Sequence, residues 1–481
     1  MLTEPPLLTT APPPPSLTDP ILIIGGAGTF GLSTAWHLAQ RGYANITCLD
    51  RFPFPSKDSA GYDCNKMARS EYNPDSTTKP DQVIHRLSQE ALKAWRENHL
   101  LRGTFHETGR ISIASSTENY EELREYYTEL QAGPRAKDVK WFDSPAELKQ
   151  FAPYLTGELA NAKAVFNPEG GWVYAKEAMQ RVGEECKRLG VKFVSGGAGT
   201  VREFIFASSQ IDNDDDDDKT SPPNSSRIIG VRCQDGTTHP AAHTILAAGA
   251  WSPTLLSLQS QLISKCWTLA HIPITNPTER ALLKDIPVIL DLEKGFFFEP
   301  ETATGLVKIC NEFPGFTRWV DDMSVPDAAG VLHKQRISVP RGHGSHPTDG
   351  IPTRSTQEIH DLLRLLKPEW ADPETYPLQD VKMCWCTDTP DREFLVCSHP
   401  HISSLTLATG ASGHGFKMLP TIGDYVADLV EGRRLEAALE SAWRWRPDAG
   451  ERPGDGTRPG AGGDLGDVGG WRRGEDERAR G

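Results

Sequence analysis

The sequence lacks the features of a protein that works in a membrane or on a nucleic acid. No apolar run approaches the roughly 20 residues that a helix needs to cross a bilayer. Basic residues are in the minority, with 51 lysines and arginines against 65 aspartates and glutamates and a formal net charge of −14. Nucleic-acid-binding proteins usually show the opposite balance. We therefore expect neither a membrane nor a nucleic acid as a partner.

Cysteine is also scarce, and its spacing excludes the usual frameworks. The nine cysteines are an odd number scattered along the chain, and no Cys-x-x-Cys pair occurs. Zinc sites and disulfide-stapled domains normally show such regular spacings. We therefore predict no metal site and a reducing, intracellular setting.

Neither end of the chain shows a targeting signal. The first twenty residues, MLTEPPLLTTAPPPPSLTDP, have no basic region and are interrupted by prolines, unlike a signal peptide. The sequence ends in RARG, without a peroxisomal address of the Ser-Lys-Leu type. A soluble cytoplasmic monomer is expected, with a peroxisomal location left open.

Three segments are predicted to lie outside the packed fold. They are rich in proline, aspartate or glycine, so they cannot bury enough apolar surface to become ordered. They are a Pro-rich disordered leader (1–19), an acidic insert with five consecutive aspartates (211–226) and a flexible tail (447–481). Because the insert lies between the strand-like runs GVKFVSG and RIIGVRC, we expect an enlarged surface loop.

Between these segments, strand patterns alternate with helix patterns, which favours an α/β fold. The run ILIIGGAG predicts a buried strand that ends in a glycine-rich turn. TFGLSTAWHLAQRG then shows the apolar spacing of a helix that ends at Gly42, and ITCLD predicts the next strand.

Two later runs repeat the form of a strand that ends in small residues. They are HTILAAGAW, which contains Gly249, and SLTLATGASG, which ends at Gly413. Small residues at the carboxyl end of a parallel sheet let a ligand approach the backbone. Gly249 and Gly413 are therefore candidate cofactor contacts.

The first strand, turn and helix carry a dinucleotide-binding pattern. Gly26, Gly28 and Gly31 form G-x-G-x-x-G between strand and helix, where glycines permit a tight turn and a close approach to a pyrophosphate. Asp50 ends the second strand, where an acid can accept hydrogen bonds from a ribose. Arg51 is either a further cofactor contact or a surface charge. The pattern does not separate NAD from FAD.

A second unusual stretch is KMCWCTDTPD, which holds two cysteines on either side of a tryptophan. In a strand, side chains alternate between faces, so Cys384 and Cys386 share one face. Two interpretations fit this arrangement. Both thiols belong to an apolar core, which is the commonest fate of a free cysteine, or they face a ligand that lies flat against the sheet.

Nine stretches between Ile21 and Pro447 occur in the order found in one protein family. They are GGAGTFGLSTAWHLAQRGY, SAGYDCNKMARSEY, TILAAGAWSPTLLSL, GFFFEP, GLVKICNEFPGFTR, ISVPRGHGSHPTD, KMCWCTDTPDREFLVCSHP, LATGASGHGFKMLPTIGDYVADLVEG and SAWRWRP. With them the sequence resembles the sarcosine oxidase-like flavoprotein family, and within it the branch of fructosyl amino acid and saccharopine oxidases.

The resemblance implies a glutathione-reductase-like FAD fold in two discontinuous domains. One is a Rossmann-type FAD-binding domain and the other is a substrate domain with an antiparallel sheet over the flavin. The expected FAD-binding segments are 20–90, 160–262 and 381–446, and the expected substrate segments are 91–159 and 263–380.

The resemblance also implies a covalent cofactor. In this family a cysteine sulfur is joined to the 8α-methyl group of the flavin, and Cys384 takes the matching position. Cys386 stands where sarcosine-type members carry a tyrosine. We therefore expect covalent FAD at Cys384, with an amine and O2 as the small-molecule partners.

Four basic residues match positions with roles in the family. Arg69 and Lys417 match the pair that holds the substrate carboxylate, which a guanidinium fork and a point charge suit chemically. Lys417 also counts as a cofactor contact. Lys66 matches a basic residue on one face of the flavin, and Lys308 matches the lysine on the other face that activates oxygen. A positive charge favours the electron transfer that makes O2 anionic.

Two more positions bear on the substrate. Glu312 stands where sarcosine-type members have histidine and where sugar-adduct oxidases have a glutamate near the sugar and the amine; we assign it both substrate binding and a catalytic role. Arg458 falls near a sugar-contacting arginine, but we assign it no role. Glu312 and WRWRP favour a fructosyl substrate, while ARSEY and TDTPDREFLV favour saccharopine, pipecolate or an N-methyl amino acid.

These features together predict an FAD-dependent oxidase of secondary amines that carry a carboxylate. Hydride passes to flavin N5, the imine is hydrolysed, and O2 is reduced to hydrogen peroxide. Two rival classes remain, namely a nicotinamide dehydrogenase and a flavin-binding protein without turnover.

Overall fold

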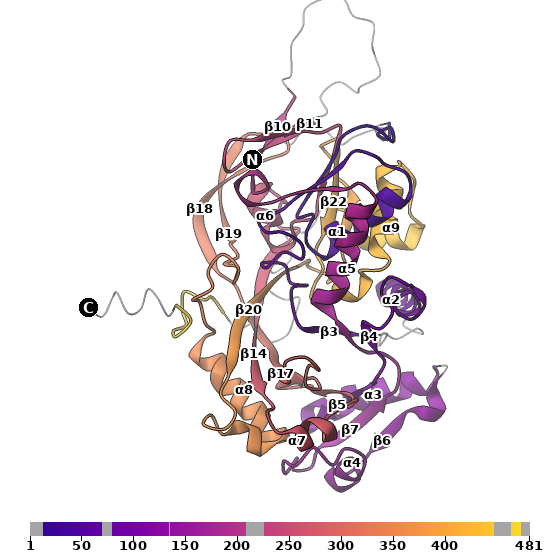
Figure 1. The fold of residues 1–481 in the computed structure, drawn as a ribbon, viewed down its shortest axis with the longest axis vertical. Helices are drawn as coiled ribbons and strands as arrows, with labels where there is room; N and C mark the ends of the chain where they lie inside the picture. The colour runs from indigo at the N-terminus through magenta and orange to yellow at the C-terminus, as the bar shows by residue number, and fades with distance from the viewer. Residues whose placement is uncertain (1–12, 70–78, 134, 208–225, 447–462, 473–481) are drawn as a thin grey trace, which may run out of the picture.

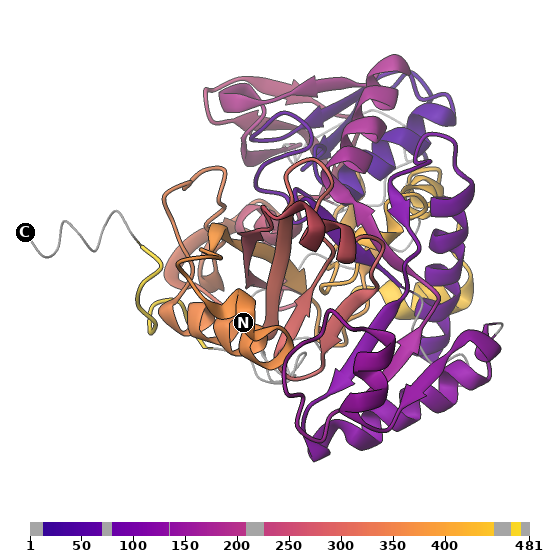
Figure 2. The ribbon, with the colours of Figure 1, turned by 60° about the horizontal axis from the view of Figure 1, so that its bottom comes forward.

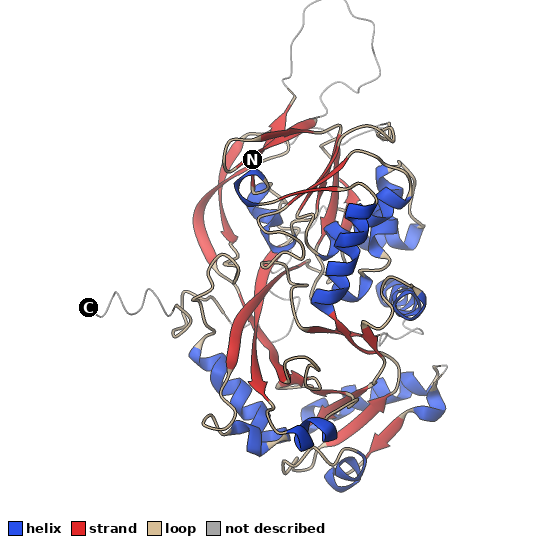
Figure 3. Cartoon of the chain, in the orientation of Figure 1, coloured by secondary structure: helices blue, strands red, loops and turns tan. Residues whose placement is uncertain are grey.

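The computed structural model describes residues 13–69, 79–133, 135–207, 226–446 and 463–472. Over these ranges the predicted α/β fold is confirmed, with two large sheets built from segments far apart in the sequence. In Figure 1 the helices α1, α5 and α9 group beside the first sheet, and α7 and α8 lie at the other end of the molecule. Figure 3 shows the strands of both sheets between these helices.

The first sheet has six strands and carries the predicted nucleotide turn. Its order is β21 (Leu395–Ser398), β22 (Leu405–Thr409), β13 (His243–Leu246), β1 (Ile21–Ile24), β2 (Ile46–Leu49) and β9 (Lys192–Val194). All neighbours are parallel except β21, which runs antiparallel at the edge. Because β1 has neighbours on both sides and covered faces, its four residues are all apolar and buried.

Three helices cover one face of this sheet. They are α1 (Thr29–Gln40), α5 (Ala175–Arg188) and α9 (Ile422–Val430), and their apolar side chains share one core with β1 and β2. The predicted helix after the glycine-rich turn is therefore confirmed and ends two residues before Gly42.

The second sheet has eight strands and is almost entirely antiparallel. Its order is β20 (Gln379–Asp388), β14 (Ile263–Pro273), β17 (Leu306–Phe316), β16 (Gly295–Phe297), β15 (Val288–Asp291), β5 (Arg110–Ala114), β7 (Lys163–Asn167) and β6 (Lys140–Phe142). Helix α8 (Thr353–Leu366) lies across it as the orange helix of Figure 2, and Ile359 and Leu363 pack into its core. The predicted antiparallel sheet is therefore present.

Smaller elements connect and flank the two sheets. They are β3 (Asn65–Ala68), β4 (Phe105–His106), β8 (Gly171–Tyr174), β10 (Val201–Phe206), β11 (Ile228–Cys233), β12 (Thr238–Pro240), the hairpin of β18 (Trp319–Pro326) and β19 (Leu332–Ser338), and the helices α2 (Lys79–Glu97), α3 (Tyr120–Gln131), α4 (Pro145–Phe151), α6 (Ser252–Leu255), α7 (Pro277–Leu282) and α10 (Ala437–Trp443). Among the described residues, no helix combines the length and apolar character that a membrane span requires.

The acidic insert has a different neighbour from the one predicted. GVKFVSG corresponds to β9, but β10 follows it before the insert and pairs with β11 in antiparallel fashion. Residues 211–225 of the insert lie outside the described residues. The segment thus connects the two strands of a hairpin, Phe206 being paired with Ile228.

The last residues of the Pro-rich leader make hydrogen bonds. Residues 13–19 are described, and the Ala44 N–H donates to the Leu17 carbonyl over 2.8 Å. The Ser16 N–H also donates to the Asp19 carboxylate over 2.8 Å. The first bond attaches the end of the leader to the loop before β2, and the second lies within the leader.

Residues 463–472 of the tail pack against the eight-stranded sheet. The side chains of Leu465 and Trp471 are 1% and 2% exposed and belong to the core of the eight-stranded sheet. The Leu465 N–H donates to the Thr317 carbonyl, and the Gly350 N–H donates to the Trp471 carbonyl. Two large apolar side chains therefore anchor a segment whose composition is otherwise that of a loop.

We expect Leu465→Ala to lower the free energy of unfolding by about 2–5 kcal/mol, because it leaves a cavity in a packed core. Leu332→Ala is the matched control, since that leucine is 66% exposed and should change stability by no more than about 0.5 kcal/mol. Chemical denaturation of both variants measures the difference. Equal stability of the two would contradict the anchoring role of the tail.

Candidate active site

A cavity of about 810 Å³ lies where the two sheets meet. Its wall includes Gly28 from the turn after β1, Trp267 from β14, Lys308 from β17 and Cys384 from β20. A single cavity therefore reaches from the glycine-rich turn of the first sheet to the antiparallel strands of the second.

The turn after β1 is packed too tightly for side chains. A Cβ atom on Gly26 would lie 2.4 Å from the Cβ of Cys48 in β2, and one on Gly31 would lie 2.3 Å from the Gly25 carbonyl oxygen. Gly28 faces the cavity instead. Gly249 and Gly413, at the ends of the two later strand runs, also line the cavity and have positive φ angles of 50° and 76°. The backbone thus forms one wall of the cavity.

Asp50 follows β2 and faces the same cavity. Its carboxylate accepts hydrogen bonds from the Ser56 hydroxyl over 2.6 Å and from the N–H groups of Phe52 and Ala27. Burial raises the pKa of Asp50 above its ordinary value, although these hydrogen bonds act in the opposite direction. The carboxylate is therefore held in place at the position where the sequence predicts a ribose contact.

Arg51 lines the cavity and also closes its rim. Its Nη1 atom donates to Asp58 over 2.9 Å and to the Ser345 hydroxyl over 3.0 Å, and its guanidinium lies over the Trp251 ring. Asp58 in turn accepts the N–H groups of Gly344 and Ser345. Arg51 is therefore not a free surface charge, since it joins the first sheet to the loop that follows β19.

The two cysteines of β20 lie on the cavity side of their strand. Cys384 and Cys386 line the cavity, and Met383 belongs to the core of the eight-stranded sheet. Trp385 packs into this core and also reaches the cavity wall. The Cys384 Sγ lies 3.6 Å from the Lys66 Nζ and 3.7 Å from the Ala60 carbonyl oxygen. Of the two interpretations of this stretch, the one with thiols facing a ligand site agrees with the geometry.

Lys66 of β3 and Lys308 of β17 both line the cavity and share a counter-charge. The Oδ2 atom of Asp63 lies 2.5 Å from the Lys308 Nζ and 3.0 Å from the Lys66 Nζ. Lys308 also donates to the Asn65 carbonyl over 2.9 Å, and its side chain is 2% exposed. Asp63 was not predicted, although it lies three residues before Lys66 in a stretch that the sequence analysis singled out.

Lys66 and Lys308 lie close together in the cavity wall. Because they contact the same Asp63 oxygen at 3.0 and 2.5 Å, their nitrogens lie no more than 5.5 Å apart. The faces of the flavin that each lysine meets stay a prediction.

The comparisons with known proteins agree with this architecture. Residues 21–429 match the family model described as FAD dependent oxidoreductase. The chain is also 30% identical to an L-saccharopine oxidase of Schizosaccharomyces pombe, over 89% of this chain and 93% of that protein. This chain belongs to the FAD dependent oxidoreductase family.

Solved structures resemble this oxidoreductase over nearly its whole length. A modified fructosyl peptide oxidase from Aspergillus nidulans matches with a TM-score of 0.83 and 40% identity, over 95% of this chain and all of that one. The fructosamine oxidase Amadoriase II from Aspergillus fumigatus matches with a TM-score of 0.78 and 34% identity, over 95% of this chain and 97% of that one. The fold is therefore that of an FAD-dependent oxidoreductase, as predicted.

The residues of the cavity fit FAD. The tight turn at Gly26 and Gly31 leaves backbone N–H groups at the start of α1, where a helix N-terminus suits a pyrophosphate. Asp50 stands at the end of the next strand for the ribose. The same cavity continues to Cys384 and the lysines, where the redox-active end of a long cofactor would lie.

The predicted carboxylate-binding residues of the oxidoreductase also line this cavity. Arg69 follows β3, and Lys417 lies in the turn before α9 with 3% of its surface exposed. The Lys417 carbonyl accepts the Trp95 indole N–H over 2.7 Å, which holds its backbone against α2. Of Glu312 only the backbone position in β17 is described, and its side chain and Arg458 lie outside the described residues.

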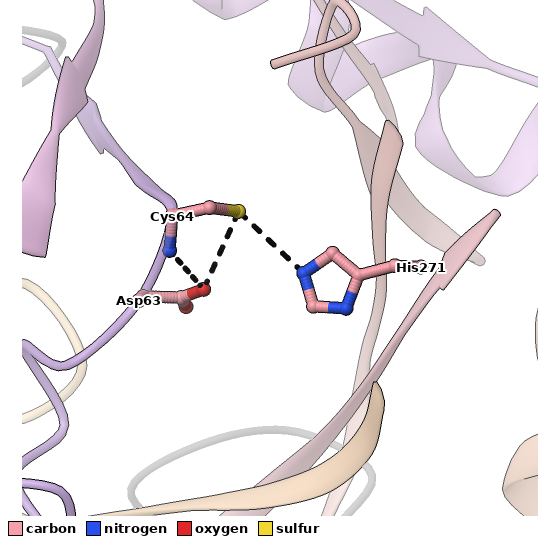
Figure 4. Close-up of side chains that lie close together, drawn as sticks. All are labelled: Asp63, Cys64 and His271. Carbon is pink, nitrogen blue, oxygen red and sulfur yellow. Dashed lines mark hydrogen bonds between the residues drawn. The ribbon is translucent and has the colours of Figure 1, made fainter. Parts of the chain in front are cut away.

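Asp63, Cys64 and His271 form a cluster beside the lysines (Figure 4). Their potential ligand atoms lie within 4.8 Å of one another, and the Cys64 Sγ is 3.5 Å from the His271 Nε2. A metal ion would have to compete with Lys66 and Lys308 for the Asp63 carboxylate. We therefore assign Asp63 to the lysines and not to a metal.

Proposed function

We propose that this FAD-dependent oxidoreductase oxidises N-fructosyl amino acids, which are secondary amines bearing a carboxylate, and that O2 is reduced to hydrogen peroxide. The observation that carries the proposal is the shared cavity. It brings Arg69 and Lys417 to the same space as Lys308 and Cys384. One site thereby combines two cations that can bind a carboxylate, a buried lysine and a thiol that faces the cofactor.

Arg69 and Lys417 bind and orient the substrate. A guanidinium fork can hold a carboxylate through two parallel hydrogen bonds, and an ammonium adds a point charge. Holding the acid fixes the position of the amine and of the C–H bond next to it. FAD, when bound, supplies the acceptor for this hydride and returns the electrons to O2. The buried Lys308 ammonium stabilises the negative charge that O2 gains.

Cys384 would hold the cofactor through a thioether bond to the flavin 8α-methyl group. Its position on the cavity side of β20, 3.6 Å from the Lys66 ammonium, supports this role. Thiol and ammonium thus line the same cavity.

A second candidate substrate class is saccharopine, pipecolate or an N-methyl amino acid. The 30% identity to an L-saccharopine oxidase supports it, as does the ARSEY stretch around Arg69. The likeness to fructosyl peptide oxidase and the identity of Glu312 support the fructosyl class. Peroxide release from a panel of these amines separates the classes. No bleaching of bound flavin by any amine would favour a flavoprotein without turnover, and a colourless protein that binds NADH would favour a dehydrogenase.

We expect Arg69→Gln to raise KM for a carboxylate-bearing amine by roughly 30-fold or more. Removing one partner of a desolvated charge pair costs about 2 kcal/mol or more, and 1.4 kcal/mol is a factor of ten. The matched control is Arg202→Gln, because Arg202 of β10 lines the cavity near Gln234, to which it donates. Steady-state kinetics with an acid and its neutral amide measure the effect. An equal loss for both substrates would contradict a carboxylate contact.

A further inference from the structure

We infer that Asp63 is a positioning residue that keeps Lys66 and Lys308 charged and fixed beside the bound cofactor. The inference rests on the proposed function, since it assigns a task to two lysines of that site. It also goes beyond it, because neither the glycine-rich turn nor the carboxylate-binding pair involves Asp63.

Both oxygens of the Asp63 carboxylate have partners in this site. The Asp63 Oδ2 contacts both ammonium groups, and its Oδ1 accepts the N–H of Cys64 over 2.9 Å. The Asp63 side chain is 1% exposed. It is not part of the wall of the large cavity, so it acts on a ligand there only through the lysines.

The electrostatics agree with a shared counter-charge. Burial alone would raise the pKa of Asp63, but Lys308, Lys66 and Lys382 lower it well below its ordinary value. Burial alone would likewise lower the pKa of Lys66, but Cys384 and Asp63 raise it above its ordinary value. Asp63 is thus the carboxylate that directly contacts Lys66, over 3.0 Å.

The other titratable groups around the two lysines do not replace Asp63. They are Cys64 before β3, His271 on β14, Cys310 on β17, and Lys382 and Cys384 on β20. Burial raises the pKa of Cys310 and of Cys64 to about 12, so both thiols are neutral at ordinary pH. Burial also lowers the pKa of His271, and Lys382 is a further cation.

Without Asp63, the two neighbouring ammonium groups would lose the carboxylate that contacts both of them. Asp380, which acts on His271 and Lys382, is 49% exposed and lies 3.5 Å from the Lys382 Nζ, so its charge is already shared with that lysine. Both burial and like-charge repulsion favour loss of a proton from one of the two ammonium groups. The positive charge beside the cofactor would then depend on pH in the range where the native site is constant. If Asp63 had a purely structural role, its removal would not make the charge beside the cofactor depend on pH in this way.

Sulfite binding to the flavin-loaded Asp63→Asn variant tests this inference without any turnover. Sulfite is a small anion that adds to protein-bound flavin and bleaches its visible absorbance, so its affinity reports the positive charge at the ring. The quantity to compare is the sulfite affinity of Asp63→Asn divided by that of the native enzyme. We expect this ratio to fall as the pH is raised, by up to about tenfold per pH unit over part of the range from pH 7 to 10. The double variant Asp63→Asn/Lys308→Met removes the repulsion between the two ammonium groups. In this variant the additional pH dependence of sulfite affinity should disappear or move to higher pH.

Parallel pH profiles of the native enzyme and Asp63→Asn would overturn the inference. The native enzyme provides a second measurement that does not require the variant to fold. If the ratio of its sulfite affinity to that of Lys308→Met changes with pH between 6 and 9, Lys308 titrates despite Asp63, and the inference is wrong. A protein that binds sulfite as expected but oxidises no amine would contradict the proposed function and leave the role of Asp63 intact.

Discussion

Replacing Lys308 with methionine is expected to slow the reaction of the reduced enzyme with O2 by about 10²–10³-fold, the usual loss for one preorganised electrostatic group. The reason is its burial, since an ammonium with a 2% exposed side chain is poorly screened by water. Methionine keeps the length and apolar stem of the side chain. Reduction by the amine should change far less, because Arg69 and Lys417 remain.

Stopped-flow spectroscopy measures the two half-reactions of Lys308→Met separately. The matched control is Lys367→Met, because this lysine is also largely buried, with 9% of its side chain exposed, but is paired with Glu369 at the end of α8. It should leave the reaction with O2 unchanged. A Lys308 variant that is reoxidised at the native rate would remove oxygen activation from this residue.

Cys384→Ala is expected to abolish covalent attachment of the flavin. After acid precipitation, the yellow colour should remain with the native pellet and move entirely to the supernatant for the variant. Cys386→Ala is the matched control, since Cys386 lines the same cavity two residues away on the same strand. Its flavin should stay in the pellet.

Two other outcomes of the Cys384 experiment would be informative. If native flavin is found in the supernatant, the cofactor is dissociable and Cys384 serves only to line the cavity. If Cys386→Ala also releases flavin, the assignment of the linkage to one thiol is wrong. Absorbance of both fractions, compared with protein content, distinguishes these results.

The parts of the site that depend on local sequence were predictable. The strand, the glycines and the helix from Ile21 to Gln40 follow one another directly, so spacing alone indicates their arrangement. The alternation of side chains in a strand likewise places Cys384 and Cys386 together.

The parts that depend on distant pairing were not predictable. Asp63 and Lys308 are 245 residues apart and meet only because a loop before β3 lies beside β17. Neither residue carries a local signal of the other. For the same reason, the sequence did not reveal that Lys66 and Lys308 share one counter-charge.

The tail shows how composition can mislead. Glycine, arginine and aspartate dominate residues 447–481 and favour an unpacked chain. Order in part of the segment comes from Leu465 and Trp471, which find a place in a core formed by other elements. Such tertiary contacts outweigh the average character of a segment.

The strand order of the first sheet also has a consequence for the newly made chain on the ribosome. β1 lies beside β13, and β22 follows as the next strand, yet β22 ends only at Thr409. At about 5–20 residues per second, β13 waits roughly 8–33 s after its own synthesis for this neighbour. During that time β13 lacks one of its two sheet partners. The cofactor, in turn, can be enclosed only after the chain has been synthesised as far as Lys417, which is part of the cavity wall.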